Sequence, residues 1–87
     1  MGHRPREKPE YLGAKLLAIR QHLKLSQSEI ACRLGFESSC ARISEYEHSN
    51  REPNLLILLR YSQIARIRME KLVDDRVGIA QFSDALK

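Results

Sequence analysis

Residues 25–53 constrain the fold of this chain more than any other stretch. Ser26 and Glu29 form an S-x-x-E capping box, in which the hydroxyl and the carboxylate each accept a backbone N–H at the start of a helix. Apolar residues then recur at helical spacing, and Gly35 follows where a helix end commonly requires a positive φ. The pattern therefore predicts a short helix over residues 27–34.

A second short helix is predicted over residues 39–47. Ile43 and Tyr46 lie three residues apart on one helical face, and Pro53 prevents the helix from continuing further. Placing this helix backwards from Ile43 is the safest alignment, because both apolar side chains must reach the core. Two short helices joined by a glycine-bearing turn form a helix-turn-helix unit.

The chain resembles the phage-repressor-like (Cro and XRE type) helix-turn-helix family in four strings, L-S-Q-S-E-I-A, L-G, I-S-E-Y-E and R-E-P. No single string is rare, but their joint order is specific, and the resemblance covers about three-quarters of the chain. It implies an all-α, compact, five-helix lambda-repressor-like DNA-binding domain. The chain departs from the family in the turn between Gly35 and Ile43, which is about two residues longer than usual.

The first helix is predicted over residues 11–23 by an apolar stripe at i, i+4, i+7 and i+11. Arg20 lies one residue off this stripe, where a charge is normally solvated. The resemblance implies that Arg20 pairs with Glu47 and so ties the first helix to the end of the third. Replacing Arg20 is then expected to destabilise the fold more than replacing Lys15, which the stripe leaves as an ordinary surface charge.

The resemblance also implies which residues of the third helix read bases. Ile43 and Tyr46 face inward, and the residues on or beside the other face are Cys40, Ala41, Arg42, Ser44 and Glu45. Arg42 carries a bidentate fork suited to guanine, Glu45 can accept from cytosine N4, and Cys40 or Ala41 can touch a thymine methyl group. Alternatives without base recognition stay open, in which Arg42 binds only phosphate and Glu45 only pairs with Arg42. DNA shape then contributes more to specificity than usual.

A second set of residues is expected to contact the DNA backbone. The resemblance implies that Gln27 holds the DNA backbone and that the loop with Asn50 and Arg51 lies along the phosphates. A helix N-terminus also favours an anion. The candidates are Ser26, Gln27, Ser39, Asn50 and Arg51.

A fourth helix is expected to begin after Pro53, with Asn54 as its cap. Its inner face is predicted to contain Leu55, Leu58, Leu59, Ser62 and Ala65. Further apolar residues widen this face, so the helix is either nearly surrounded by core or helps to form a dimer contact. A short fifth helix is expected over residues 69–73.

The chain is expected to contain three parts. Residues 1–10 form a flexible basic arm that is either solvated or follows phosphates, and residues 11–73 form the DNA-binding domain. Residues 74–87 are a C-terminal segment with an apolar stripe of Ile79, Phe82 and Leu86. The stripe must be covered by its own domain or by a second subunit, and we favour a dimer contact.

Composition narrows the class of function. The net charge is +4, and its excess lies within residues 12–73, which favours a polyanionic partner. No apolar run reaches the roughly 20 residues of a membrane span, so we expect a cytoplasmic protein and no membrane partner. The two cysteines lack the spaced partners of a zinc site, and no nucleophile, base and orienting group can be placed together. We therefore expect no metal, no cofactor and no enzymatic activity.

The sequence thus predicts a sequence-specific double-stranded DNA-binding transcriptional regulator of repressor type, acting as a homodimer on an inverted repeat with half-sites about one turn apart. Two alternatives keep the same fold. One is the DNA-binding antitoxin of a toxin–antitoxin pair, with a protein partner on the C-terminal segment. The other is a protein-interaction module, suggested by Glu45 and Glu52 beside the DNA-reading positions.

Overall fold

The computed structural model describes residues 9–35 and 40–86, and all of the regular secondary structure in these ranges is helical. The described ranges contain six helices: α1 (Leu12–His22), α2 (Gln27–Leu34), α3 (Cys40–Glu47), α4 (Leu55–Ala65), α5 (Met69–Val73) and α6 (Ile79–Leu86). The first five lie where the sequence predicts them. The expected count of five is wrong because the C-terminal segment adds α6. No helix in these ranges has the length and apolarity needed to cross a membrane.

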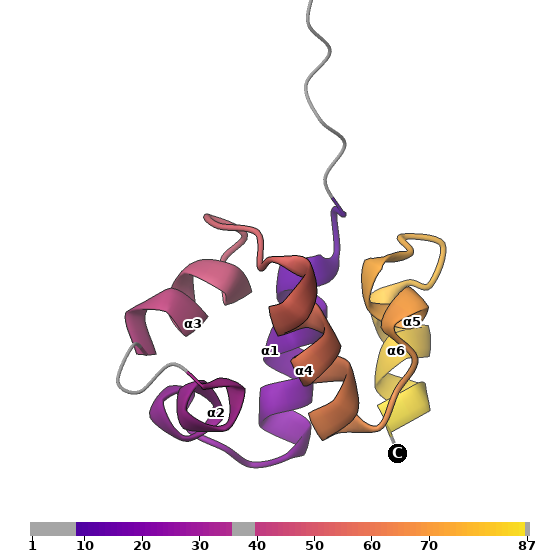
Figure 1. The fold of residues 1–87 in the computed structure, drawn as a ribbon. Helices are drawn as coiled ribbons and strands as arrows, with labels where there is room; N and C mark the ends of the chain where they lie inside the picture. The colour runs from indigo at the N-terminus through magenta and orange to yellow at the C-terminus, as the bar shows by residue number, and fades with distance from the viewer. Residues whose placement is uncertain (1–8, 36–39, 87) are drawn as a thin grey trace, which may run out of the picture.

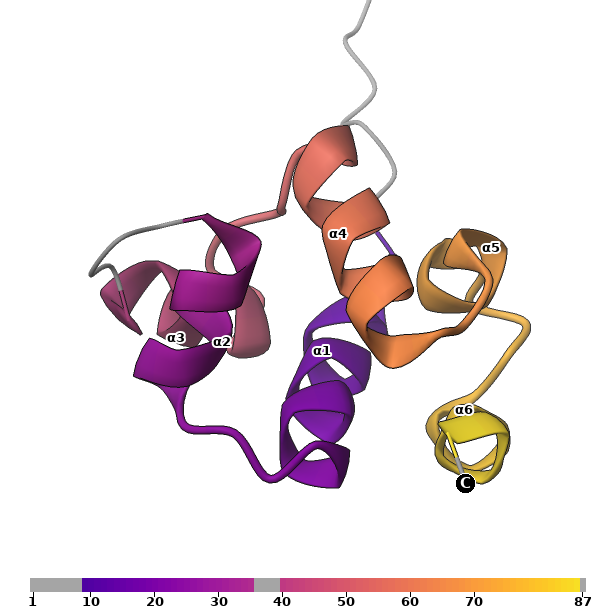
Figure 2. The ribbon, with the colours of Figure 1, turned by 60° about the horizontal axis from the view of Figure 1, so that its bottom comes forward.

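The helices are arranged around α1 (Figures 1 and 2). α2 and α3 lie to one side of α1 and α4, while α5 and α6 lie to the other. α1 contacts α3, α4, α5 and α6, and α2 contacts α3 and α4. Because every other helix packs on α1 or on a neighbour of α1, the core forms along this one helix.

Each of the six helices contributes to one apolar core. The predicted stripe of α1 is buried at Leu12, Leu16 and Ile19. The remaining core residues, from α2 to α6 in order, are Ile30, Ala31, Leu34, Ile43, Tyr46, Ile57, Leu58, Tyr61, Leu72 and Phe82. A chain of this length can bury only a small core, so its stability depends on core residues from every helix.

Local hydrogen bonds set the ends of α2. The Ser26 hydroxyl accepts from the Glu29 N–H at 3.0 Å, and the Glu29 carboxylate accepts from the Ser26 N–H at 2.8 Å. That second bond holds the pKa of the Glu29 carboxyl below its ordinary value. At the other end Gly35 has a φ of 93°, and the Arg60 guanidinium donates to the Leu34 carbonyl at 2.6 Å. The capping box predicted from the sequence is therefore present in full.

Three helices are followed by a residue other than glycine in the left-handed region, and the first of these residues is Lys24, which follows α1 with a φ of 57°. Ser49 follows α3 with a φ of 61°, and Arg66 follows α4 with a φ of 56°. None of these residues is a glycine, so the sequence gives no glycine signal for the ends of these helices. The start of α4 is clearer, because the Asn54 side chain accepts from the Ile57 N–H at 2.9 Å, as predicted.

Lys15 is not a surface charge, so the sequence-based interpretation of this residue is wrong. Its side chain is fully buried, and its ammonium group donates to the carbonyls of Lys71 at 2.8 Å and Asp74 at 2.9 Å. The same group lies 5.6 Å from the centre of the Phe82 ring. Burial lowers the pKa of Lys15. Lys15 therefore attaches the end of α5 and the middle of α6 to α1.

This attachment answers what covers the C-terminal segment. Phe82 is fully buried against its own chain, whereas Ile79 remains 40% exposed. The Asp75 carboxylate also accepts the backbone N–H groups of Glu10 and Tyr11 at 2.8 and 3.2 Å, and so joins the residues just before α1 to the loop between α5 and α6. The sequence left open whether the C-terminal stripe is covered by its own domain or by a second subunit. Phe82 is covered by its own domain.

The inner face of α4 differs from the predicted one. Leu58 and Ser62 are buried as expected, but Leu55 is 73% exposed and Leu59 is 40% exposed. Tyr61 is fully buried in their place. α4 is apolar around most of its girth, so periodicity alone could not decide which side faces inward. Packing places the largest side chain, Tyr61, in the core.

Gly13 marks a close approach between α1 and the end of α3. A Cβ atom at this position would lie 2.9 Å from the carbonyl oxygens of both Tyr46 and Glu47. These are backbone atoms, which cannot move aside as a flexible side chain can. The absence of a side chain at Gly13 therefore allows α3 to end against α1.

We predict that Gly13→Ala lowers the free energy of unfolding by about 1–3 kcal/mol, because overpacking outweighs the gain in helix propensity. Gly78→Ala is the matched control, since its Cβ would meet nothing within 4 Å. Chemical denaturation of both variants measures the difference. Equal stability of the two variants would show that the contact between α1 and α3 is looser than described.

Candidate nucleic-acid interface

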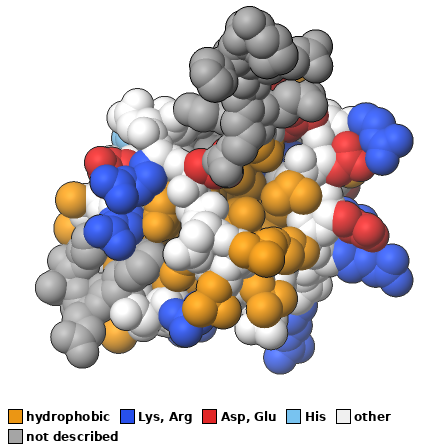
Figure 3. All heavy atoms as spheres, turned by 45° about the horizontal axis from the view of Figure 1, so that its top comes forward, with side chains coloured by type: hydrophobic (Ala, Val, Ile, Leu, Met, Phe, Trp, Pro, Cys, Tyr) orange, Lys and Arg blue, Asp and Glu red, His pale blue; other side chains and the backbone are white. Residues whose placement is uncertain are grey.

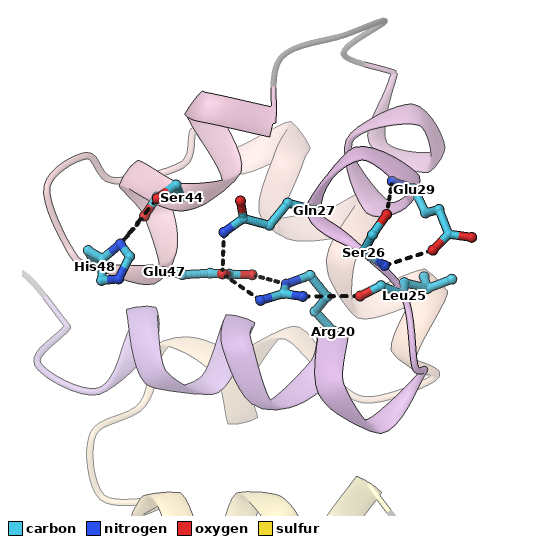
Figure 4. A network of polar contacts seen from close by, with 8 residues as sticks. All are labelled: Arg20, Leu25, Ser26, Gln27, Glu29, Ser44, Glu47 and His48. Atoms are coloured by element: carbon cyan, nitrogen blue, oxygen red, sulfur yellow. Dashed lines mark hydrogen bonds and ion pairs between the residues drawn. The ribbon is translucent and has the colours of Figure 1, made fainter.

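A polar network joins α1, α2 and α3 (Figure 4). Nε of Arg20 donates to one oxygen of the Glu47 carboxylate at 2.6 Å, and Nη2 donates to the other at 3.2 Å. The third guanidinium nitrogen donates to the Leu25 carbonyl at 3.1 Å. The ion pair that the sequence predicted between Arg20 and Glu47 is thus present and bidentate.

The network is largely removed from solvent. The Glu47 side chain is 2% exposed and the Arg20 side chain 19%. The hydrogen bonds with Glu47 raise the pKa of Arg20, which keeps its charge in place beside the carboxylate. A buried carboxylate with a bidentate cation fixes the angle between its helices, because any rotation would leave a charge without its partner.

Gln27 belongs to this network as well. Its side-chain N–H donates to the Glu47 carboxylate at 3.1 Å. The sequence placed Gln27 on a DNA phosphate, and here its amide nitrogen is used within the fold. Ser26, the other candidate at this helix end, is exposed, and its hydroxyl serves the capping box. The start of α2 is therefore held by bonds to α3 and within α2 itself.

The outer face of α3 carries the candidate base-reading residues. Cys40 and Ala41 are exposed, and Arg42, Ser44 and Glu45 are half-buried. Ile43, Tyr46 and Glu47 are buried on the opposite side. The structure therefore presents the five candidates together on the accessible side of one short helix.

Glu45 is joined to the loop that follows α3. Its carboxylate lies 3.4 Å from Nε of Arg51, and its backbone carbonyl accepts from the N–H groups of Asn50 at 2.8 Å and Arg51 at 3.3 Å. The sequence suggested Arg42 as the partner of Glu45 and a phosphate as the partner of Arg51. The ion pair with Arg51 was missed because it spans a helix end, where spacing rules for helices do not apply.

His48 is a further residue at this surface that the sequence reasoning missed. Its Nδ1 lies 2.9 Å from the Ser44 carbonyl and 3.2 Å from the Ser44 hydroxyl, and its ring is exposed. The signal was available, since Ser44 and His48 are four residues apart and so share a helical face. The contact with His48 therefore orients the hydroxyl of Ser44, which is a candidate base-reading residue.

Two parts of the expected interface lie outside the described residues. These are Ser39, a phosphate candidate, together with most of the turn after Gly35, and residues 1–8 of the basic arm. Within the described ranges, no group of three or more His, Cys, Asp and Glu residues is placed to hold a metal ion. What the described surface offers is hydrogen-bonding and charged groups around the outer face of α3.

Comparison of the chain with protein-family models, with curated proteins and with solved structures finds no match.

We predict that Arg20→Met lowers the free energy of unfolding by about 3 kcal/mol, because the buried Glu47 carboxylate loses its cation. Arg33→Met is the control, since Arg33 is an exposed arginine on α2. The double variant Arg20→Met/Glu47→Leu should recover part of the loss, because no charge is then left buried. Urea denaturation of all three provides the comparison. A loss no larger for Arg20→Met than for Arg33→Met would contradict a structural role for the pair.

Proposed function

We propose that this protein is a sequence-specific double-stranded DNA-binding transcriptional regulator that acts through a helix-turn-helix unit formed by α2 and α3. The observation that carries the proposal is the buried network of Arg20, Glu47 and Gln27, which fixes the two helices against α1. A recognition helix must be held at a fixed angle if its side chains are to meet base edges. The network supplies that rigidity while the outer face of α3 remains accessible.

In this proposal, α3 enters the major groove with its outer face toward the bases. Cys40 and Ala41 are small and exposed, which suits contact with thymine methyl groups. Arg42 provides the donors for guanine O6 and N7, and Glu45 accepts from cytosine N4. Arg51 then has a role beyond the phosphates, because its charge beside Glu45 offsets the repulsion between that carboxylate and the DNA backbone.

The phosphate contacts are assigned to both sides of α3. On one side, Ser26 and Gln27 lie at the start of α2, where the helix dipole favours an anion. On the other, Asn50 and Arg51 are exposed in the loop after α3. The excess positive charge within residues 12–73 draws the whole surface toward a polyanion.

We expect a pool of random duplexes, selected for binding and then sequenced, to yield an inverted repeat. Binding should weaken steeply as salt rises, because each phosphate contact releases counterions. Salt-sensitive binding without a motif would overturn sequence specificity. No binding at any salt concentration would overturn DNA binding altogether and favour the protein-interaction alternative on the same fold.

A substitution at Glu45 tests the assignment of bases. Glu45→Gln should change the preferred base pair at one position of each half-site from cytosine toward adenine, because glutamine pairs with adenine N6 and N7. The cost at the original site is expected to be about 1–3 kcal/mol, measured by titration of both duplexes. His22→Gln, at an exposed position on α1, is the control. A selected motif identical to that of the unaltered protein would remove Glu45 from the base-reading set.

A further inference from the structure

The His48 side chain is fixed at one of its two ring nitrogens (Figure 4). Nδ1 lies 2.9 Å from the Ser44 carbonyl oxygen, and the backbone N–H of His48 donates to the same oxygen at 3.0 Å. A carbonyl oxygen only accepts hydrogen bonds, so Nδ1 must carry a proton to make this contact. The Ser44 hydroxyl also lies near this nitrogen, at 3.2 Å. The contact therefore assigns the proton of the neutral imidazole to Nδ1.

This assignment decides what the second ring nitrogen, Nε2, can do. In the neutral ring Nε2 is only an acceptor, and in the protonated ring it is a donor that shares a positive charge. The His48 side chain is exposed, and among the described residues Ser44 is the one polar partner of its ring. Protonation thus changes an accessible acceptor into a cationic donor while the contact with Ser44 is kept.

Two carboxylates on α3 precede His48, and both are paired with arginines. Glu45 lies beside Arg51 of the following loop, and the buried Glu47 is bound by Arg20 of α1. Figure 3 shows acidic and basic side chains next to one another, with a histidine close by, on the side of the molecule where α3 lies. Neither carboxylate is therefore left to compensate a charge on His48.

The other charged groups around α3 form no ion pair with His48 either. α1 and α2 both pack against α3. Lys15 of α1 donates to carbonyls at the end of α5, and the Glu29 carboxylate of α2 is engaged in the capping box. Across the described residues, Arg42 and Glu52 included, no ion pair contains the His48 ring. A positive charge on this ring is thus left for an anion from outside the chain.

His48 lies between the base-reading face of α3 and the loop that is assigned to phosphates. It follows the last residue of α3, lies one helical turn from Ser44, and precedes Asn50 and Arg51. Phosphates border the major groove on both sides. A cationic donor at the end of a recognition helix therefore meets the DNA backbone.

We propose that the protonated His48 ring binds a DNA phosphate through Nε2, so that the affinity for DNA rises as pH falls. A phosphate oxygen accepts the charged N–H, whereas the neutral ring would present its Nε2 lone pair to an oxygen that is also only an acceptor. Histidine is the residue whose side chain changes charge between about pH 5 and 8. The inference rests on the proposed function and adds to it a contact residue and a dependence on pH.

Titration of random-sequence duplex DNA with the full chain at about pH 5.5 and about pH 8, each at several salt concentrations, tests the proposal. Random sequence suffices because a phosphate contact carries no sequence information. The variant is His48→Asn, whose side-chain N–H can replace Nδ1 on the Ser44 carbonyl while Nε2 is lost. His22→Asn, at an exposed position at the end of α1, is the matched control. Circular dichroism at both pH values checks that each variant stays folded.

We expect the unaltered chain to bind DNA about tenfold more tightly at the lower pH, because one hydrogen bond between charged groups is gained. The slope of log K against log salt should also steepen by about 0.9, because one more phosphate is neutralised. Both differences should persist in His22→Asn and disappear in His48→Asn. A merely structural role of His48 would not change the salt slope.

Equal pH dependence in His48→Asn and in the unaltered chain would overturn this inference and leave the proposed function in place. No DNA binding at either pH would overturn the proposed function, and this inference with it. A ¹H–¹⁵N NMR spectrum of the imidazole rings, recorded without DNA at about pH 8, tests the inference separately. We expect the proton of His48 on Nδ1, and a proton on Nε2 instead would overturn the inference whatever the chain binds.

Discussion

The structure depends on one buried charge. Glu47 lies at the end of α3 with its carboxylate almost fully removed from water, and a carboxylate in such a place must be compensated. Arg20 supplies two donors and the charge, while Gln27 supplies a third donor. Because these partners come from α1 and α2, one carboxylate sets the relation among three helices. Removal of either charged partner would leave the other charge buried and uncompensated.

The other side of the molecule is held by a second buried charge of opposite sign. Lys15 occupies the middle of α1, where its ammonium group satisfies carbonyls at the end of α5 and faces the ring of Phe82. α1 thus has two cationic side chains that face its neighbours: Lys15 points toward α5 and α6, and Arg20 points toward α2 and α3. The contacts of Lys15 with the end of α5 and with Phe82 hold α6 against α1, so that α6 contributes Phe82 to the small core.

Local chemistry made much of the fold predictable from the sequence. The capping box at Ser26, the turn at Gly35 and the cap at Asn54 are each specified by a few neighbouring residues, and each is present in the structure. Features that depend on distant packing were not predictable in this way. Lys15 lies beside the apolar stripe of α1 and reads as a surface lysine, because its acceptors are more than fifty residues away. The orientation of α4 could not be chosen from periodicity, because apolar residues lie around most of its girth, and the structure buries Ile57, Leu58 and Tyr61.

The candidate site was likewise predictable only in part from the sequence. The position of Arg20 opposite Glu47 came from resemblance to a family. The partner of Glu45 depends on the backbone path after α3 and was missed, whereas the contact of Ser44 with His48 has a signal in their four-residue spacing. Whether the surface of α2 and α3 meets DNA is tested most directly by a ¹H–¹⁵N NMR titration with duplex DNA. The account predicts that the largest shift changes fall at the start of α2, on the outer face of α3 and in the loop through Arg51. Changes confined to α4, α5 and α6, or no changes at all, would contradict it.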